Sequence, residues 1–291
     1  MNTVNPMKIT IICGPTAGGK SALALDMAQK HNGVIINADS MQVYDALHVL
    51  TAQPFKAEQK LVPHKLYAVL KPEEKCTAGS WREMAIREIR QAFTQNQTPI
   101  IVGGTGFYLK TLTEGLSPIP EIPPEFRDRA AREQSALGNP GFHAALAKRD
   151  PVIAGKLNPN DTQRLIRAWE VLEATGKSLS YWQSLPPEGP PKGWQFETRV
   201  IVPEREDLYK RCDARFDAML ENGIIAEVKK LDMLIENGKV PADAAITNAL
   251  GFHPLQAHIH EKCAIEQAIG QAKLETRQYA KRQLTWFKNQ T

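Results

Sequence analysis

The feature that most constrains this sequence is the eight-residue stretch GPTAGGKS, which comes directly after a short apolar run, KITIICG. It matches the phosphate-loop pattern G-x-x-x-x-G-K-[ST], in which glycines let the backbone curl until its N–H groups converge on phosphate oxygens. The pattern needs a strand before it and a helix after it, and both are predicted here. The predicted phosphate-binding residues are Gly14, Pro15, Thr16, Ala17, Gly18, Gly19, Lys20 and Ser21.

Three side chains near this loop suggest chemistry. Lys20 would bring a positive charge to the terminal phosphate, and the Ser21 hydroxyl would bind a magnesium ion. Asp39 follows the next apolar run, at the carboxyl end of a predicted strand, where open α/β sheets bind ligands. Its carboxylate could be a magnesium ligand or a base, and the residues alone leave both roles open. The loop does not name a reaction either, because nucleotide kinases and ATPases use the same loop.

The first 115 residues alternate between strand and helix patterns. Continuous Val- and Ile-rich runs predict buried strands at 8–14, 33–39 and 99–104, and a helical pattern follows the first of them at 20–31. Strands that are apolar throughout indicate a parallel sheet covered on both faces. We therefore predict an α/β fold with a P-loop NTPase-like parallel sheet as its core.

A change in pattern divides the chain. Residues 116–195 are bounded by proline-rich stretches and carry helical patterns, which predicts a helical insertion. The predicted catalytic core is therefore made of residues 1–115 and 196–291. After the insertion we expect a returning strand at 198–203. Long helices are then expected at 207–222, 224–237 and 265–287.

Charge and cysteine content narrow the class of protein. The whole protein has a net charge of +4. The last 21 residues alone carry the same excess, because they contain five lysines and arginines and one acidic residue, Glu275. A basic C-terminal segment of this kind is either a solvent-exposed helix or a binding site for a polyanion. The four scattered cysteines predict buried thiols in a reducing cytosol, and the N-terminal sequence predicts neither a signal peptide nor a membrane span.

Five stretches, in order along the chain, resemble the tRNA dimethylallyltransferase family. They are GPTAGGKS, INADSMQVY, IVGGTGFYLKTLTEGLS, NPNDTQRLIRAWEV and TRQYAKRQLTWFK, and together they run from Gly14 to Lys288. The resemblance implies transfer of a dimethylallyl group from dimethylallyl diphosphate to N6 of the adenine on the 3′ side of the anticodon. The acceptors would be tRNAs that read codons starting with U, with Mg²⁺ as cofactor and diphosphate released. It further implies a cytoplasmic, monomeric enzyme that contacts the anticodon stem-loop and no membrane.

The resemblance also assigns roles to residues of the catalytic centre. Asp39 matches the base that takes the proton from the adenine amine, a step that a poor nucleophile needs. Lys20 would stabilise the departing diphosphate, Thr16 matches a diphosphate contact, and Arg215 matches an arginine that clamps the diphosphate. Arg211, one turn earlier, is the alternative to Arg215.

The residues that the resemblance assigns to tRNA are more dispersed. Those expected around the extruded base are Asp39, Ser40, Met41, Gln42 and Thr105. Those expected in the insertion are Arg127, Gln163, Arg164, Leu165, Ile166 and Arg167. Near the C-terminus, Lys281 and Arg282 precede Trp286 and Phe287, a mixture of basic and aromatic residues that suits a single-stranded loop. An ordinary amphipathic helix and buried aromatic residues would give the same two patterns.

Three positions depart from the family pattern. Gly18 stands where the family usually has serine, Gln53 where it has lysine, and Phe252 where it has tyrosine.

Three other functions stay open. They are isopentenyl transfer to free adenine nucleotides, an ATP-dependent small-molecule kinase, and an RNA-binding protein without catalysis. The insertion and the basic end argue against a small acceptor. The intact Lys20, Ser21 and Asp39 argue against a protein without catalysis.

Overall fold

The computed structural model describes residues 7–289, and the chain forms two compact units. One unit is made of residues 1–113 and 191–291, and the other is Glu114–Pro190. The ends of the predicted core, 1–6 and 290–291, lie outside the described residues. The second unit starts two residues before the predicted start of the insertion, at 116. It ends five residues before the predicted end, at 195, because the chain already rejoins the sheet at Trp194.

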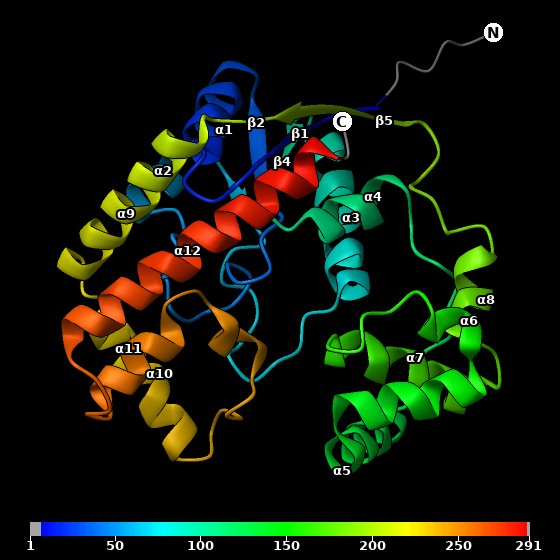
Figure 1. Cartoon of the computed structure of the whole chain (residues 1–291). Coiled ribbons are helices and arrows are strands. Elements are labelled where there is room, and N and C mark those ends of the chain that lie inside the picture. Colours follow the sequence, from blue (N-terminus) through cyan, green and yellow to red (C-terminus); the bar gives the residue numbers. More distant parts are fainter. Residues whose placement is uncertain (1–6, 290–291) are drawn as a thin grey trace, which may run out of the picture. The chain divides into compact units, whose positions relative to one another are not determined.

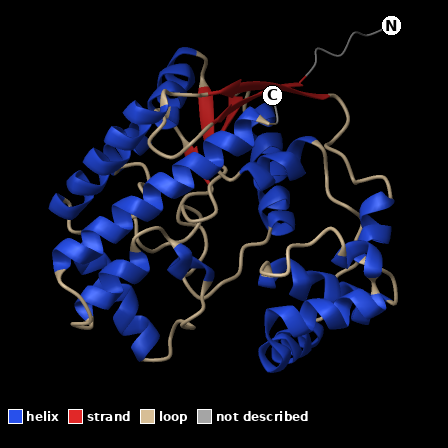
Figure 2. Ribbon diagram, in the orientation of Figure 1, coloured by secondary structure: helices blue, strands red, loops and turns tan. Residues whose placement is uncertain are grey.

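A five-stranded, all-parallel sheet forms the centre of the first unit (Figure 2). Its strands, in chain order, are β1 (Met7–Cys13), β2 (Gly33–Asn37), β3 (His64–Lys65), β4 (Thr98–Gly103) and β5 (Trp194–Val200). Their order across the sheet is β3-β2-β4-β1-β5. The prediction of a parallel sheet is confirmed. The two-residue strand β3 was not predicted, and β5 starts four residues before the predicted returning strand.

Helices cover both faces of this sheet, as the apolar strands predicted. On one face Ile12 and Ile100 pack against Ala24 and Ala28 of α1 (Lys20–Lys30). On the other face, alternate residues such as Ile11 join a core with α3 (Ala78–Thr94) and α4 (Gly106–Thr113). The edge strand β5 is mostly exposed and departs from the fully apolar pattern.

The remaining helices of this unit follow the short α2 and the last strand. They are α2 (Lys56–Leu61), α9 (Arg205–Glu221), α10 (Ile224–Glu236), the 3₁₀ turn η1 (Ala245–Asn248), α11 (Phe252–Ile259) and α12 (Ile265–Lys288). The three long predicted helices are confirmed within two residues at each end. The long α12 lies beside α9 and α11 (Figure 1).

Ion pairs join α12 to α9. Lys273 contacts Asp217 at 2.6 Å, and Arg277 donates to both carboxylate oxygens of Asp213 at 2.6 and 2.8 Å. Two of the five basic residues near the C-terminus are therefore committed to packing within the protein. The excess positive charge that could meet a polyanion lies further along α12.

The second unit is helical. Its helices are α5 (Pro124–Arg149), α6 (Pro151–Ala154), α7 (Thr162–Thr175) and α8 (Leu179–Ser184). The long α5 is interrupted at Gly138, whose φ of 65° and ψ of 170° are not helical. The rings of Phe142 and Trp169 pack at a tilt, with centroids 4.8 Å apart, in a separate apolar core, so this unit has the interior of an independent domain.

No helix within residues 7–289 is long and apolar enough to cross a membrane. All four cysteines are free thiols; Cys13 and Cys212 are buried as predicted, whereas Cys76 and Cys263 are partly exposed.

The close contact of β4 with β2 yields a stability prediction. A Cβ atom on Gly103 would overlap the backbone of Ala38, because the two chains touch there. Gly103→Ala should therefore lower the free energy of unfolding by about 1–3 kcal/mol, the usual cost of overpacking. Urea denaturation measures the change.

The matched control is Gly270→Ala, in the exposed interior of α12, where an added Cβ has nothing within 4 Å. It should raise the free energy of unfolding by up to about 1 kcal/mol, because alanine favours helix. Equal effects of the two substitutions would contradict the tight contact at Gly103.

Candidate active site

Three loops meet at the carboxyl edge of the sheet. The phosphate loop follows β1, Asp39 follows β2, and the turn Gly104–Thr105 follows β4. The Thr105 N–H donates to the Ala38 carbonyl at 3.2 Å, and the Ser40 N–H donates to the Thr105 hydroxyl at 3.0 Å. The structure therefore brings together the predicted residues from the ends of separate strands.

The phosphate loop has the curled conformation that its glycines predicted. Gly14 has a φ of 148°, and a Cβ there would lie 2.5 Å from the Ile201 carbonyl oxygen. Gly19 has a φ of 92° and stands directly before α1. The Lys20 ammonium folds back over the loop and donates to the carbonyl oxygens of Gly14 and Pro15, at 3.0 and 2.8 Å. The loop thus holds a cation above the start of a helix.

Burial governs the charge of Lys20. Desolvation lowers the pKa of its ammonium to about 8, although the nearby Asp39 carboxylate acts in the opposite direction. Arg215 adds a like charge that also lowers this pKa. A bound phosphate group would supply the negative charge that these cations lack, so the site favours an anion.

Arg215 reaches the phosphate loop from α9. Its Nη2 atom donates to the Thr16 hydroxyl at 2.6 Å, which joins two residues that the sequence assigned to the same anion. Burial lowers the pKa of Arg215 from its ordinary value, and the charge of Asp39 partly opposes this shift. Arg211 lies on the same helix and is exposed. This position does not support its predicted role as the alternative to Arg215.

The Asn37 side chain holds the backbone of Asp39 by hydrogen bonds. The Asn37 side chain accepts from the Asp39 N–H at 2.9 Å and donates to the Leu66 carbonyl at 3.0 Å. The Asp39 carboxylate accepts from the Met41 N–H at 2.9 Å. Tyr279 of α12 is also close, because burial and then the charge of Asp39 raise the pKa of that phenol to about 12. The carboxylate is thus held where Lys20, Arg215 and α12 converge.

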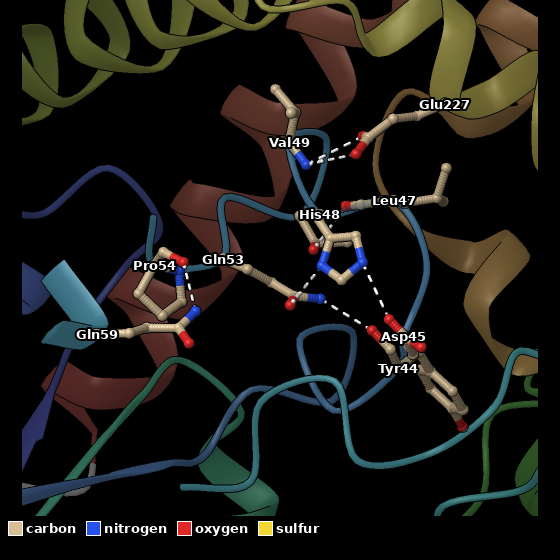
Figure 3. Close-up of polar contacts among 10 residues, drawn as sticks. Tyr44, Asp45, Leu47, His48, Val49, Gln53, Pro54, Gln59 and Glu227 are labelled. Atoms are coloured by element: carbon tan, nitrogen blue, oxygen red, sulfur yellow. Dashed lines mark hydrogen bonds and ion pairs between the residues drawn. The ribbon is translucent and has the colours of Figure 1, made fainter. Parts of the chain in front are cut away.

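The residues after Met41 form a loop bonded to itself. Gln42 donates to the carbonyl oxygens of Thr51 and Ala52 at 2.8 and 2.9 Å, so its amide N–H groups serve the loop. Figure 3 shows Gln53 donating to the Tyr44 carbonyl at 2.9 Å and meeting the His48 ring at 3.0 Å.

Glu227 of α10 fastens the same loop by accepting from the Val49 N–H at 3.0 Å. The departure at Gln53 is thus accommodated as a buried loop brace.

Two places could hold a metal ion. Ser21 is exposed in the first turn of α1, beside Lys20, and its hydroxyl is an oxygen ligand of the kind that Mg²⁺ prefers. A second group, Asp232, Glu236 and His260, lies on α10 and at the end of α11. Its buried Asp232 already accepts from Gln256 at 2.7 Å and pairs with His260 at 2.6 Å, which is a structural link between the helices.

The exposed end of α12 forms a groove of about 510 Å³. Its lining residues are Gln278, Lys281, Arg282, Thr285, Trp286 and Asn289. Phe287 is buried in the core, so of the two aromatic residues only Trp286 is open to a ligand. The predicted basic and aromatic surface is therefore present, with a single aromatic ring.

The helical unit sorts its predicted residues into two groups. Leu165 and Ile166 are buried in the core, so their predicted contact with tRNA is corrected to packing. Arg127 donates to Gln163 at 2.9 Å and stands 3.6 Å from the buried Glu170 carboxylate.

Two further arginines of this unit also have carboxylate partners. Arg167 donates to Glu170 at 2.6 Å, and the exposed Arg164 pairs with Asp161 at 3.3 Å. Arg127, Arg164 and Arg167 are thus held in place by carboxylates.

The other two departures have local explanations. A Cβ on Gly18 would lie 2.9 Å from the Pro15 carbonyl oxygen, which already accepts the Gly18 N–H, so this loop suits glycine. Phe252 is fully buried in the main core, where an apolar ring fits. Neither position alters Lys20, Arg215 or Asp39.

The lowered pKa of Lys20 predicts a pH dependence of anion binding. An anion favours the charged ammonium, so the affinity for inorganic pyrophosphate should fall as pH rises through about 8. The loss should approach about tenfold for each further pH unit. Isothermal titration of the protein with pyrophosphate measures it.

The control is Lys20→Arg, whose guanidinium stays charged over this range. The ionisation of pyrophosphate itself affects both proteins equally. Parallel pH profiles for the two proteins would therefore contradict a titrating Lys20.

Comparison with known proteins shows the family of this chain. The model of the family described as IPP transferase matches residues 42–290. A tRNA dimethylallyltransferase of Rhodospirillum centenum is 49% identical over 97% of this chain and 88% of its own length. One of Paramagnetospirillum magneticum is 48% identical over 96% of this chain and 87% of its own length.

Solved structures give the same result. The tRNA isopentenylpyrophosphate transferase of Bacillus halodurans has a TM-score of 0.67 at 31% identity, covering 97% of this chain and 87% of its own. A eukaryotic dimethylallyltransferase acting on tRNA has a TM-score of 0.82 at 29% identity, covering 96% of this chain and 69% of its own. The sheet, the phosphate loop and these relatives together establish that the chain belongs to the IPP transferase family.

Proposed function

We propose that this enzyme transfers a dimethylallyl group from dimethylallyl diphosphate to N6 of the adenine on the 3′ side of the anticodon. The acceptors are tRNAs that read codons starting with U. The observation that carries the proposal is the meeting of Lys20, Arg215 and Asp39 at one edge of the sheet, in a chain whose relatives are named for this reaction.

In the proposed reaction, diphosphate is the leaving group. The allylic C–O bond breaks and negative charge develops on the departing diphosphate. Lys20, the loop N–H groups and Arg215 are placed to stabilise that charge as it forms, and burial strengthens their effect. Magnesium, held by the Ser21 hydroxyl, would neutralise further charge on the diphosphate.

The adenine amine supplies the new bond. Its nitrogen attacks the allylic carbon, an N–C bond forms, and a proton must leave the nitrogen. Asp39 is the proposed base, because its carboxylate lies next to the phosphate loop and accepts from the Met41 N–H, while Asn37 holds the Asp39 backbone. Ser40 and Thr105, bonded to each other, would border the extruded base.

The tRNA is proposed to contact two surfaces. On α12 these are the exposed Lys281 and Arg282, with Trp286 as a stacking surface for an unpaired base. In the helical unit they are the exposed faces of Arg127 and Arg164, with Gln163. A cytoplasmic location and a monomeric state stay predictions.

One experiment separates the alternatives. The protein is incubated with magnesium and labelled dimethylallyl diphosphate, together with tRNA, AMP or no acceptor. We expect label in tRNA only, with one diphosphate released for each group transferred. Transfer to AMP would favour the nucleotide prenyltransferase. Turnover of labelled ATP in a parallel reaction would favour a kinase, and tRNA binding without transfer would indicate a non-catalytic protein.

Replacement of Asp39 distinguishes a base from a metal ligand. Asp39→Asn keeps the shape of the side chain but cannot accept the proton, so kcat should fall by about 10²–10⁴. The affinities for both substrates should change little, and extra magnesium should not restore turnover. Steady-state kinetics at several magnesium concentrations measure this.

Asp26→Asn is the control, because Asp26 lies on the surface of α1 and pairs only with Lys30 among the described contacts. It should leave turnover unchanged. Recovery of the Asp39 variant at high magnesium would show that Asp39 holds the metal.

A further inference from the structure

We propose that Gln283 is a positioning residue of the phosphate loop, through which α12 fixes the diphosphate site. In the sequence it stands directly after Lys281 and Arg282, as though it belonged to the same RNA-binding surface. The proposal rests on the proposed function for the identity of the ligand, but the geometry of the loop itself stands independently of that function.

The side-chain amide of Gln283 is buried and joins two of the three loops of the site. Its Oε1 atom accepts from the Thr16 N–H at 2.7 Å, and its Nε2 atom donates to the Gly104 carbonyl at 2.8 Å. Only 6% of the residue is exposed. By contrast, Lys281 and Arg282 are exposed and line the groove of α12, so adjacent residues of the helix face different surroundings.

The turn after β4 is shaped to admit this side chain. A Cβ on Gly104 would overlap the Gln283 amide nitrogen, and one on Gly106 would lie 2.5 Å from the Trp286 ring. Glycine at both positions lets α12 approach the backbone closely. The GGTG and KRQLTW stretches therefore form one interlocking contact, although the bonded pair Gly104 and Gln283 is 179 residues apart in the sequence.

This contact fixes the first half of the phosphate loop. Thr16 is held at its N–H by Gln283 and at its hydroxyl by Arg215. The next residue, Ala17, has a φ of 57° and packs against Leu208, Cys212 and Ala280 of α9 and α12. The Thr16 N–H points toward Gln283 and is therefore not available to phosphate. The N–H groups later in the loop would bind phosphate, and the contact at Thr16 would keep them in a fixed arrangement.

Removal of the amide should therefore weaken anion binding and spare RNA binding. Gln283→Leu leaves the Thr16 N–H and the Gly104 carbonyl without their partner. We expect the dissociation constant of inorganic pyrophosphate, and the KM for dimethylallyl diphosphate, to rise about tenfold or more. The dissociation constant of a tRNA anticodon stem-loop should stay within about twofold. Gln283→Met, whose flexible side chain fills similar space, should behave in the same way if the leucine variant does not fold.

Two controls separate positioning from simple destabilisation. Thr276→Val removes a buried hydroxyl two turns earlier on α12, which bonds only to the Ala272 carbonyl among the described contacts. It should cost stability without changing pyrophosphate affinity. Lys281→Ala combined with Arg282→Ala should show the opposite pattern, with weaker binding of the stem-loop and normal pyrophosphate affinity.

Hydrogen exchange tests the same contact without any ligand. The amide of Thr16 should exchange faster in Gln283→Leu than in the wild type, while the amides of β1 should not change. Weaker stem-loop binding with normal pyrophosphate affinity would overturn the proposal in favour of an RNA contact. Equal pyrophosphate affinities in the Gln283 and Thr276 variants would overturn it as well.

The proposed function can fail separately. If the wild type bound no pyrophosphate, the proposed function would be wrong and hydrogen exchange would decide the present inference. Faster exchange at Thr16 would support the brace, and unchanged exchange would overturn it.

Discussion

The active site depends on the close approach of backbone and side chains at the carboxyl end of β4. Gly103 touches Ala38, Gly104 admits Gln283, and Gly106 lies under Trp286. Each contact joins a different neighbour: the segment after β2 that carries Asp39, the Gln283 side chain that contacts the phosphate loop, and the exposed groove of α12. Without side chains at these glycines, one turn holds the proposed base and the anion site in register. Any Cβ there would separate parts that must act together.

The sequence predicted those features that depend on local patterns. Continuous apolar runs predicted three central strands, and the glycine pattern predicted the loop from Gly14 to Ser21, because backbone curvature is written directly in those residues. Long-range partners were not predictable. Nothing near Gln283 shows that its amide reaches Thr16, and a buried glutamine looks like one more polar residue on an amphipathic helix. The start of the edge strand β5 was predicted four residues too late, because an exposed strand lacks the apolar pattern that marks a buried one.

Charge on α12 illustrates the same limit. The sequence counts five basic residues near the C-terminus, but Lys273 and Arg277 are paired with α9. Partly exposed pairs of this kind contribute at most about 1 kcal/mol each, so their main effect is to orient the helix. That orientation directs Gln283 inward and Lys281 outward. Similarly, in the helical unit the buried Glu170 holds Arg127 and Arg167, so two apparently free cations have fixed directions.

The burial that lowers the pKa of Lys20 is also what makes it useful. An ammonium 4 Å from a phosphate oxygen gains about 1 kcal/mol in water but about 4 kcal/mol at the effective dielectric near a protein surface. Carbonyl oxygens of Gly14 and Pro15 hold the cation until an anion replaces them. This stabilisation responds to charge alone and would serve a phosphorus or a carbon electrophile equally. The choice of reaction must therefore come from elsewhere: from Asp39, the proposed base for the attacking amine, and from the surfaces that we propose to bind the RNA.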